Sequence, residues 1–307
     1  MNVLLINSKI SECGVHQYGK RISNILKTEN RFNFFYFEID SDEEYRTVIS
    51  TVNPDYIIYN WHHSTMPWLS PHDTHQASKK TKQLFIFHEL NLPDMFYSDG
   101  YLMSDMSEDE NNKRFSILRP IFETNLEKNK NDIITIGSFG FGFHNKGFDK
   151  ICKLVDESFD EAIIRLHITN PFFGDYSGNT TNQIIDMCKS QIKNKKIKLE
   201  ITTHFLDDVD ILNFLNTNDL NVFLYDDMYG RGLSSVIDYA VSVNTPIAVN
   251  NSYMFRHIVK ETPNISISNN LTLKDILDLG TENVNFYKNK WNHTNFKNNI
   301  YKILCQI

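Results

Sequence analysis

The feature that most constrains this chain is a regular exchange between short apolar runs and stretches of helical periodicity. Runs such as VLLIN (3–7) and DYIIYN (55–60) are apolar along most of their length and are bounded by turn residues. Such runs are typical of strands that are buried on both faces of a parallel sheet. Strands that alternate with helices predict a doubly wound α/β fold.

The exchange runs through two parts of the chain and therefore predicts two Rossmann-like halves. In the first half we expect strands at 3–7, 32–39, 55–60 and 83–90, with helices at 16–28 and 42–52. In the second half we expect strands at 133–139, 162–168, 197–201, 220–225 and 246–249, with helices at 146–157, 181–193, 207–216 and 233–243. Between the halves, the polar and acidic residues 91–116 predict a loop, and residues 119–132 predict a charged connector.

The length of 307 residues also favours two domains, because it exceeds the usual size of one hydrophobic core. We expect an N-terminal domain at 1–122, a second domain at 123–285 and a C-terminal helix at 286–307. In that last segment the apolar side chains recur at helical spacing, at Trp291, Phe296, Ile300 and Leu304. This spacing predicts a helix that packs back on the N-terminal domain.

Composition excludes several classes of protein. Hydrophobic residues make up 41% of the chain and charged residues 22%, which is the balance of a globular protein. The net charge of −7 argues against nucleic acid as a partner. Four cysteines without a CxxC pair argue against a zinc ribbon or a disulfide framework and favour a reducing compartment.

Targeting signals are not evident in the sequence. No apolar run approaches the roughly 20 residues that a spanning helix needs, and the N-terminus MNVLLINSKI does not have the pattern of a signal peptide. We therefore expect a cytoplasmic protein. The basic stretch 189–200 is interpreted as a solvated helix end, and the alternative is a peripheral contact with an anionic membrane.

The stretch YGRGLSSVIDYAVSVNTPIAV (229–249) places an arginine and two serines at the predicted start of a helix. A helix N-terminus presents unpaired N–H groups that stabilise an anion, and Arg231 can add a bidentate contact to a phosphate. Gly232 allows close approach of a ligand to the backbone. The alternative is that Ser234 or Ser235 only caps the helix and that Arg231 is solvated.

A second glycine-rich stretch, GSFGFGFHNKGF (137–148), follows the first strand of the second half. Ligands of open α/β sheets bind where strands lead into helices. Gly137 begins the flexible turn, and Lys146 is placed to reach a phosphate. The stretch is neither a dinucleotide-binding GxGxxG motif nor a Walker A loop. Because both stretches follow strands of the same domain, we expect two phosphate-binding loops to converge there.

These stretches resemble motifs of the GT-B glycosyltransferases, in particular the large retaining family 4 (group 1). The second half carries a strand-end glycine, a lysine–glycine pair and a helix leading into a proline-initiated strand: Gly137, Lys146–Gly147–Phe148, and Arg231 through Val249 with Asn244–Thr245–Pro246–Ile247. In the first half, Gly14–Val15 resembles the family's acceptor-side loop, and FHEL (87–90) resembles its histidine–acid strand end. The resemblance implies two Rossmann-like domains that face a central cleft, with the acceptor on residues 1–122 and the nucleotide sugar on residues 123–285.

The chain also departs from the family pattern. Ser138 and Phe139 stand where the family usually has a basic residue in the donor loop. The family's two glutamates, eight residues apart, are missing: alignment on Pro246 places Arg231 and Tyr239 at the two positions, and a slip of one residue places Asp238 at the second. We hypothesise that Asp238 binds the donor ribose and that Arg231 replaces the missing loop cation.

The resemblance implies that His88 is catalytic, because a histidine at this strand end lies over the reacting sugar and stabilises an oxocarbenium-like state. Glu89 would orient it or bind acceptor hydroxyls. The alternative is a histidine held by local backbone. His62 and His63 follow another strand end on the same edge and are candidate acceptor residues. The neighbouring Trp61 and Trp68 form either a sugar platform or part of the core.

Two patterns suggest a metal ion, and we expect neither to bind one. The DxD triplet 40–42 precedes a helix and is interpreted as an N-cap with an acidic first turn. His72 and His75 form an HxxH pair in a predicted loop without a nearby cysteine, and with His62 and His63 they make a poor zinc ligand set. We therefore expect no metal and no cofactor, with the nucleotide sugar acting as a substrate.

The resemblance implies a metal-independent, hexosyltransferase-like enzyme of polysaccharide biosynthesis that retains the anomeric configuration. The acceptor would be a glycan, a lipid-linked molecule or another molecule. The donor-side candidates are Gly137, Lys146, Arg231, Gly232, Ser234, Ser235 and Asp238, the acceptor-side candidates are Gly14, Val15, His62 and His63, and the catalytic candidates are His88 and Glu89. Two alternatives remain: an inactive sugar-nucleotide-binding subunit and a GT-B-type nucleotide-sugar epimerase.

Overall fold

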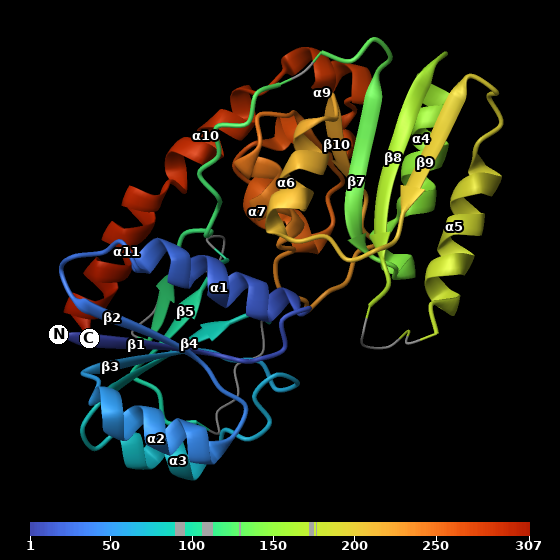
Figure 1. Ribbon diagram of the computed structural model, residues 1–307. Coiled ribbons are helices and arrows are strands. Elements are labelled where there is room, and N and C mark those ends of the chain that lie inside the picture. Colours follow the sequence, from blue (N-terminus) through green and yellow to red (C-terminus); the bar gives the residue numbers. More distant parts are fainter. Residues whose placement is uncertain (90–95, 106–112, 129, 172–174, 176) are drawn as a thin grey trace. The chain divides into compact units, whose positions relative to one another are not determined.

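The computed structural model describes residues 1–89, 96–105, 113–128, 130–171, 175 and 177–307. The chain divides into two compact units, each built on a parallel sheet (Figure 1). Unit 1 contains Met1–Ile121, Gly230–Leu233 and Trp291–Ile307, and unit 2 contains Phe122–Tyr229 and Ser234–Lys290. The predicted α/β class with two Rossmann-like halves is confirmed.

The sheet of unit 1 has the strand order β2-β1-β3-β4-β5-β6, with each neighbouring pair parallel. Its strands are β1 (Asn2–Asn7), β2 (Asn33–Glu38), β3 (Tyr56–Asn60), β4 (Lys82–Phe87), β5 (Gly100–Met103) and β6 (Arg114–Ser116). The residues of β1 alternate between two cores, so that Leu5 packs on one face and Leu4 on the other. This double burial explains why the run VLLIN is apolar without a gap.

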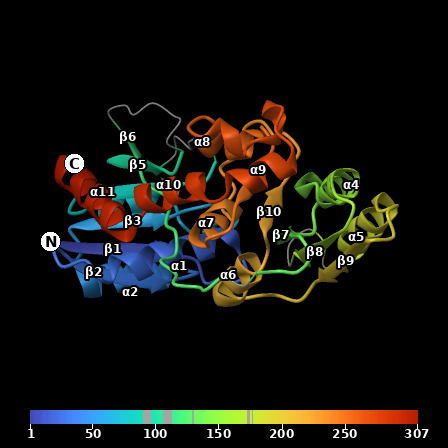
Figure 2. The same cartoon turned by 90° about the horizontal axis from the view of Figure 1, so that it is seen from above.

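Helices cover both faces of this sheet (Figures 1 and 2). Helices α1 (Gly14–Leu26) and α11 (His293–Gln306) pack against one face, and α2 (Asp42–Val52) packs against the other, where α3 (Pro71–Ala77) also lies. Helix α11 contributes four buried apolar side chains to the first core: Phe296, Ile300, Ile303 and Leu304. The C-terminal helix therefore packs on the N-terminal sheet, as the spacing of its apolar residues predicts.

The sheet of unit 2 has the strand order β11-β10-β7-β8-β9 and is also parallel. Its strands are β7 (Thr135–Phe141), β8 (Ala162–Thr169), β9 (Ile197–Thr202), β10 (Leu220–Phe223) and β11 (Ile247–Val249). Helices α4 (Phe148–Ser158), α5 (Asn179–Gln191) and α9 (Leu273–Leu279) pack on one core, while α7 (Val236–Ser242) contacts Phe139 of β7 through Tyr239. The other helical segments are α6 (Asp208–Asn216), α8 (Arg256–Val259), α10 (Glu282–Lys290), and the short 3-10 turns η1 (His144–Lys146), η2 (Tyr253–Phe255), η3 (Pro263–Ile265) and η4 (Ile267–Asn269).

The predicted loop 91–116 is wrong in part, because β5 and β6 lie within it. Both strands are short, and β6 has the sequence RFS, so neither produces an apolar run that periodicity can detect. Residues 91–95 and 106–112 of this loop lie outside the described residues. The structure also starts α7 at Val236 rather than at 233, with Ser235 at the N-cap position and no side-chain capping bond.

In both sheets the chain reverses the direction in which it adds strands. The reversal lies between β1 and β3 in unit 1 and between β7 and β10 in unit 2. Ligands of open α/β sheets bind beyond the carboxyl ends of the strands at such a switch point. Each unit therefore has one place where the fold itself favours a ligand.

No helix in the described part of the chain has the length and apolar character needed to cross a membrane.

Candidate functional site

A chain of polar side chains marks the switch point of unit 1. Asn7 ends β1 and Asn60 ends β3, and the Nδ2 atom of Asn60 donates to Oδ1 of Asn7 at 2.8 Å. The same Nδ2 donates to the carbonyl of Val15 at 2.7 Å. Oδ1 of Asn60 lies 2.7 Å from Nε2 of His88, which follows β4. Two buried asparagines therefore connect the start of α1 with the predicted catalytic histidine.

The hydrogen bonds between Asn7, Asn60 and His88 determine the tautomer of His88. Because the amide nitrogen of Asn60 is committed to Asn7 and Val15, its Oδ1 faces the imidazole and can only accept. The proton of neutral His88 therefore lies on Nε2, and Nδ1 keeps its lone pair. A ring with this tautomer can accept a hydrogen bond from a ligand hydroxyl.

The surroundings of His88 keep its imidazole neutral. Burial lowers the pKa of His88 to about 3, and the nearby Arg119 and Arg21 act in the same direction. The ring of Tyr18 stands edge-on to the imidazole, with the two centroids 5.2 Å apart. A neutral ring cannot serve as a general acid near pH 7, so its chemistry here is that of a hydrogen-bonding group.

Three further candidates from unit 1 lie beside one another, namely His62, Glu89 and Arg231. Nε2 of His62 lies 3.7 Å from Oε1 of Glu89, and the same oxygen accepts from Nη1 of Arg231 at 3.0 Å. Burial lowers the pKa of His62, and the adjacent His63 adds to this effect. We expected Arg231 to bind phosphate together with Lys146, and in the structure its guanidinium pairs with Glu89, one of the two predicted catalytic residues.

Gly232 explains how Arg231 reaches Glu89. A Cβ atom added at Gly232 would lie 1.6 Å from the carbonyl oxygen of His88, a distance that no side chain tolerates. The segment Gly230–Leu233 packs with unit 1, although the residues on either side of it belong to unit 2. The glycine therefore serves a close backbone approach to His88 within unit 1.

The switch point of unit 2 brings Lys146 against Tyr225. Nζ of Lys146 lies 4.0 Å from the centroid of the Tyr225 ring, which is a cation–π contact. Gly147 has a positive φ of 63°, and a Cβ there would lie 1.9 Å from the carbonyl oxygen of Leu224. This close approach holds Lys146 beside the end of β10. Burial raises the pKa of Tyr225 above its usual range, while the hydroxyl of Ser234 interacts with it and acts in the opposite direction.

Other donor-side candidates lie inside the fold of unit 2. Gly137 is in the interior of β7, and a Cβ there would lie 1.9 Å from Nδ2 of Asn218. Asp238 is fully buried in α7. Ser235 precedes α7 with helical backbone angles, and the N–H of Ser234 donates to the carbonyl of Met254. Of the seven donor-side candidates, Lys146 and Ser234 are thus the two that the structure brings together through Tyr225.

The open interpretations from the sequence are resolved in several places. Trp61 packs against Phe87 and Phe96 with centroid distances of 6.0 and 5.3 Å, which supports the core explanation. The side chain of Ser41 accepts from the N–H of Glu44, so the N-cap interpretation of the DxD triplet is confirmed. Gly14 begins α1 and has open space around it.

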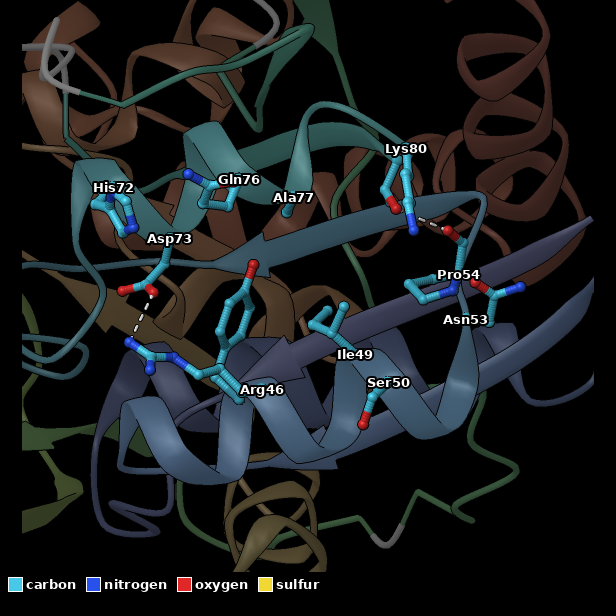
Figure 3. A pocket seen from close by; sticks show the side chains of 12 residues that line it. Arg46, Ile49, Ser50, Asn53, Pro54, His72, Asp73, Gln76, Ala77 and Lys80 are labelled. Carbon is cyan, nitrogen blue, oxygen red and sulfur yellow. Dashed lines mark hydrogen bonds and ion pairs between the residues drawn. The ribbon is translucent and has the colours of Figure 1, made fainter.

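Unit 1 also has a groove between α2 and α3, with a cavity volume of about 520 Å³ (Figure 3). Figure 3 shows Arg46 pointing from α2 toward Asp73 of α3, at 3.4 Å. Lys80 and His72 line the same groove. None of the candidate site residues lines it, so the groove is separate from the switch point.

Two residues that contact candidate site residues were not predicted from the sequence: Asn60, beside His88, and Tyr225, beside Lys146. Asn60 ends the apolar run YIIYN, and Tyr225 ends LNVFLY. The sequence feature that could have identified them is a residue with a polar group at the end of an otherwise apolar strand. Neither residue belongs to a recognisable motif, which is why the pattern alone did not select it.

Several solved structures have the same architecture as this chain. No protein-family model and no curated protein matches the chain. Anabaena HepE in complex with UDP is similar over 100% of both chains, with a TM-score of 0.72 and 10% identity. Sucrose-phosphate synthase from Thermosynechococcus elongatus is similar over 100% of this chain and 98% of its own, with a TM-score of 0.69 and 11% identity. A glycosyltransferase from Rickettsia africae is similar over 98% of this chain and 97% of its own, with a TM-score of 0.66 and 12% identity.

This chain has the GT-B fold. The similarity extends over essentially the full length of both partners in each comparison, so it covers both units of the fold. Identities of 10% to 12% establish the architecture and leave the activity to be derived from the site.

Proposed function

We propose that this protein is a glycosyltransferase that moves a sugar from a nucleotide-diphosphate sugar to a glycan or lipid-linked acceptor. The single observation that carries the proposal is the neutral His88, held by Asn60 at the switch point of unit 1. A neutral imidazole at this position would bind a hydroxyl group of the sugar through a hydrogen bond and would not act as a proton donor. The GT-B fold supports the proposal, and the complex of HepE with UDP supports a uridine nucleotide as the first donor to test.

The proposed role of His88 follows from its tautomer. Nδ1 would accept a hydrogen bond from a donor hydroxyl, and this contact would position the sugar ring during transfer. An uncharged imidazole also avoids repulsion with the positive charge that develops on an oxocarbenium-like sugar. We propose retention of the anomeric configuration by resemblance to the retaining family.

In unit 2, Lys146 would neutralise charge on the departing diphosphate. Its ammonium is held against the face of the Tyr225 ring, and a positive charge in this position can stabilise the negative charge that develops on a leaving diphosphate. Ser234 lies beside the same ring and can donate its hydroxyl. The transfer would need no metal ion or cofactor. A lipid-linked acceptor would bring the protein to a membrane surface, with the basic residues 189–200 as the contact.

The test is an assay for transfer from UDP-sugars to a panel of glycan and lipid-linked acceptors, run in the presence of EDTA. We expect transfer by the wild-type chain and a loss of about 100-fold in kcat for His88→Ala, with KM for the donor little changed. His75→Ala, which changes an exposed histidine of α3, is the matched control. Nucleotide binding without turnover would instead support an inactive binding subunit, and release of an altered nucleotide sugar without acceptor would support an epimerase.

A further inference from the structure

Two histidines and a carboxylate converge beyond the ends of β3 and β4 in unit 1. One ligating atom from each of His62, His63 and Glu89 lies within 4.8 Å of the other two. Nε2 of His62 and Oε1 of Glu89 are 3.7 Å apart, and the rings of His62 and His63 are 4.2 Å apart between centroids. The three side chains come from two different loops, so the fold rather than the local sequence brings them together.

This group of atoms has the composition of a transition-metal site. Two imidazole nitrogens and one carboxylate oxygen are ligands that Zn²⁺ and related divalent ions prefer, whereas Mg²⁺ and Ca²⁺ prefer oxygen alone. Metal–ligand bonds of about 2.1 Å place tetrahedral ligand atoms about 3.4 Å apart. The pair His62–Glu89 is already near that spacing, and the exposed His63 needs only a side-chain adjustment.

Ser64 supplies an outer contact that suits this use of His62. Its hydroxyl oxygen lies 2.7 Å from Nδ1 of His62. In the structure the backbone N–H of Ser64 also donates to Nδ1 of His62, at 3.2 Å. If Nε2 binds a metal ion, the ring proton lies on Nδ1; the backbone bond is then lost, and Nδ1 donates to the Ser64 hydroxyl instead. Outer contacts of this kind fix the orientation of metal-binding imidazoles.

The guanidinium of Arg231 binds the carboxylate of Glu89 and would compete with a metal ion for it. Its Nη1 donates to Oε1 of Glu89 at 3.0 Å, the same oxygen that faces His62. Two positive charges on one carboxylate repel each other, so an ion and the guanidinium would exclude one another. This competition predicts that removal of the arginine strengthens metal binding.

We propose that His62, His63 and Glu89 form a site for one divalent transition-metal ion, and that Arg231 pairs with Glu89 when the ion is absent. The inference is independent of the proposed transfer reaction, which uses no metal. Since Glu89 is a catalytic candidate and both histidines are acceptor-side candidates, an ion bound here would oppose transfer rather than assist it.

The test is titration of the full-length, chelator-treated protein with Co²⁺, followed by absorption spectroscopy and calorimetry. We expect one Co²⁺ per chain, displaced by Zn²⁺ and not by Mg²⁺. His62→Ala and Glu89→Gln should each weaken the affinity about tenfold or more, and Arg231→Gln should strengthen it about fivefold. His75→Ala should leave the affinity unchanged. Thermal unfolding of each variant identifies any loss that reflects unfolding.

The three variants give outcomes that separate a site from nonspecific binding. The absence of stoichiometric Co²⁺ binding to the wild-type protein would overturn the proposal. So would binding that survives in a folded His62→Ala, Glu89→Gln double variant. Weaker or unchanged binding in folded Arg231→Gln would overturn the competition with the guanidinium. His63→Ala, at an exposed position that tolerates change, provides an additional ligand variant with little risk to the fold.

Discussion

Nε2 of His88 lies 2.7 Å from Oδ1 of Asn60, and this contact joins the ends of β4 and β3 at the switch point of unit 1. Asn60 is itself fully buried and is bound to Asn7 and to the backbone of α1. The imidazole is thus oriented by a group that has no freedom to rotate. This contact determines the tautomer of His88, while burial keeps the imidazole neutral.

Replacement of Asn60 by aspartate should raise the pKa of His88. A carboxylate at 2.7 Å favours the imidazolium form, which burial at present disfavours so strongly that the pKa is about 3. NMR titration of the His88 ring in Asn60→Asp measures the shift directly. Asn285→Asp, at an exposed position of α10, adds the same charge elsewhere and should leave the ring unchanged. An unaltered His88 titration in folded Asn60→Asp would contradict the contact between residue 60 and the imidazole, on which the assignment of the tautomer depends.

The free energy of unfolding should fall as the pH is lowered from 6.5. Burial lowers the pKa of His88 to about 3 and that of His167 to about 4. Below pH 6.5 the unfolded chain therefore binds protons that the folded chain does not. The stabilising contribution of the two neutral histidines is fully present above pH 6.5. It is lost progressively down to about pH 4 for His167 and about pH 3 for His88. Between pH 6.5 and 5 we expect about 1–2 kcal/mol of loss for each histidine. Denaturant unfolding across this range should show a shallower slope for His167→Gln than for the wild type.

Substitution of Gly232 by alanine should destabilise unit 1. The added Cβ would lie 1.6 Å from the carbonyl oxygen of His88, and backbone atoms must move to relieve the overlap. Overpacking of this kind costs about 1–3 kcal/mol, and it should also displace Arg231 from Glu89. Gly14→Ala is the matched control because its Cβ meets nothing within 4 Å. Equal urea midpoints for the two variants would show that the segment 230–233 does not pack on His88.

Lys146→Ala should weaken the binding of a nucleoside diphosphate by about 10- to 100-fold, the usual worth of a charge-assisted hydrogen bond. The effect should be smaller for the uncharged nucleoside, because the loss concerns the phosphates. Calorimetric titration with UDP and with uridine separates the two contributions. Lys153→Ala, an exposed lysine of α4 paired with Glu157, provides the control. If both lysine variants bind UDP equally well, Lys146 does not contact the phosphates.

Phe296→Ala should destabilise unit 1 by about 3–5 kcal/mol, because it removes a buried aromatic ring and leaves a cavity. Phe296 is 0% exposed in the core that α11 shares with α1. Phe286 of α10 is 47% exposed, so Phe286→Ala should change the stability by much less. Thermal unfolding followed by circular dichroism compares the two. Similar melting temperatures for both variants would contradict the packing of α11 on the first sheet.

Much of the fold was predictable because its signals are local. A strand buried on both faces must be apolar along its length, so runs such as VLLIN and YIIYN mark β1 and β3 without knowledge of their neighbours. The same holds for the Ser41 cap, whose acceptor lies three residues from its donor. The short strand β6 was missed because three residues with one aromatic produce no periodicity.

The candidate site was predictable only in its parts. Strand-end positions identified His62, His88 and Lys146, because the carboxyl ends of parallel strands form one edge. Their partners were not predictable, since Asn60 is 28 residues from His88 and Arg231 is 142 residues from Glu89 along the chain. A local sequence pattern spans only a few residues and cannot predict contacts between residues so far apart in the chain.

The sequence by itself determined the fold class, the apolar strands, the terminal helix and the chemical groups available at the strand ends. These depend on burial and periodicity, which act over a few residues. The tertiary structure alone decided that Arg231 pairs with Glu89, that Asn60 orients His88, and that Asp238 is buried inside α7. Those outcomes depend on which surfaces meet after the chain has folded, because hydrogen bonds and ion pairs form between atoms that are close in space and not in sequence.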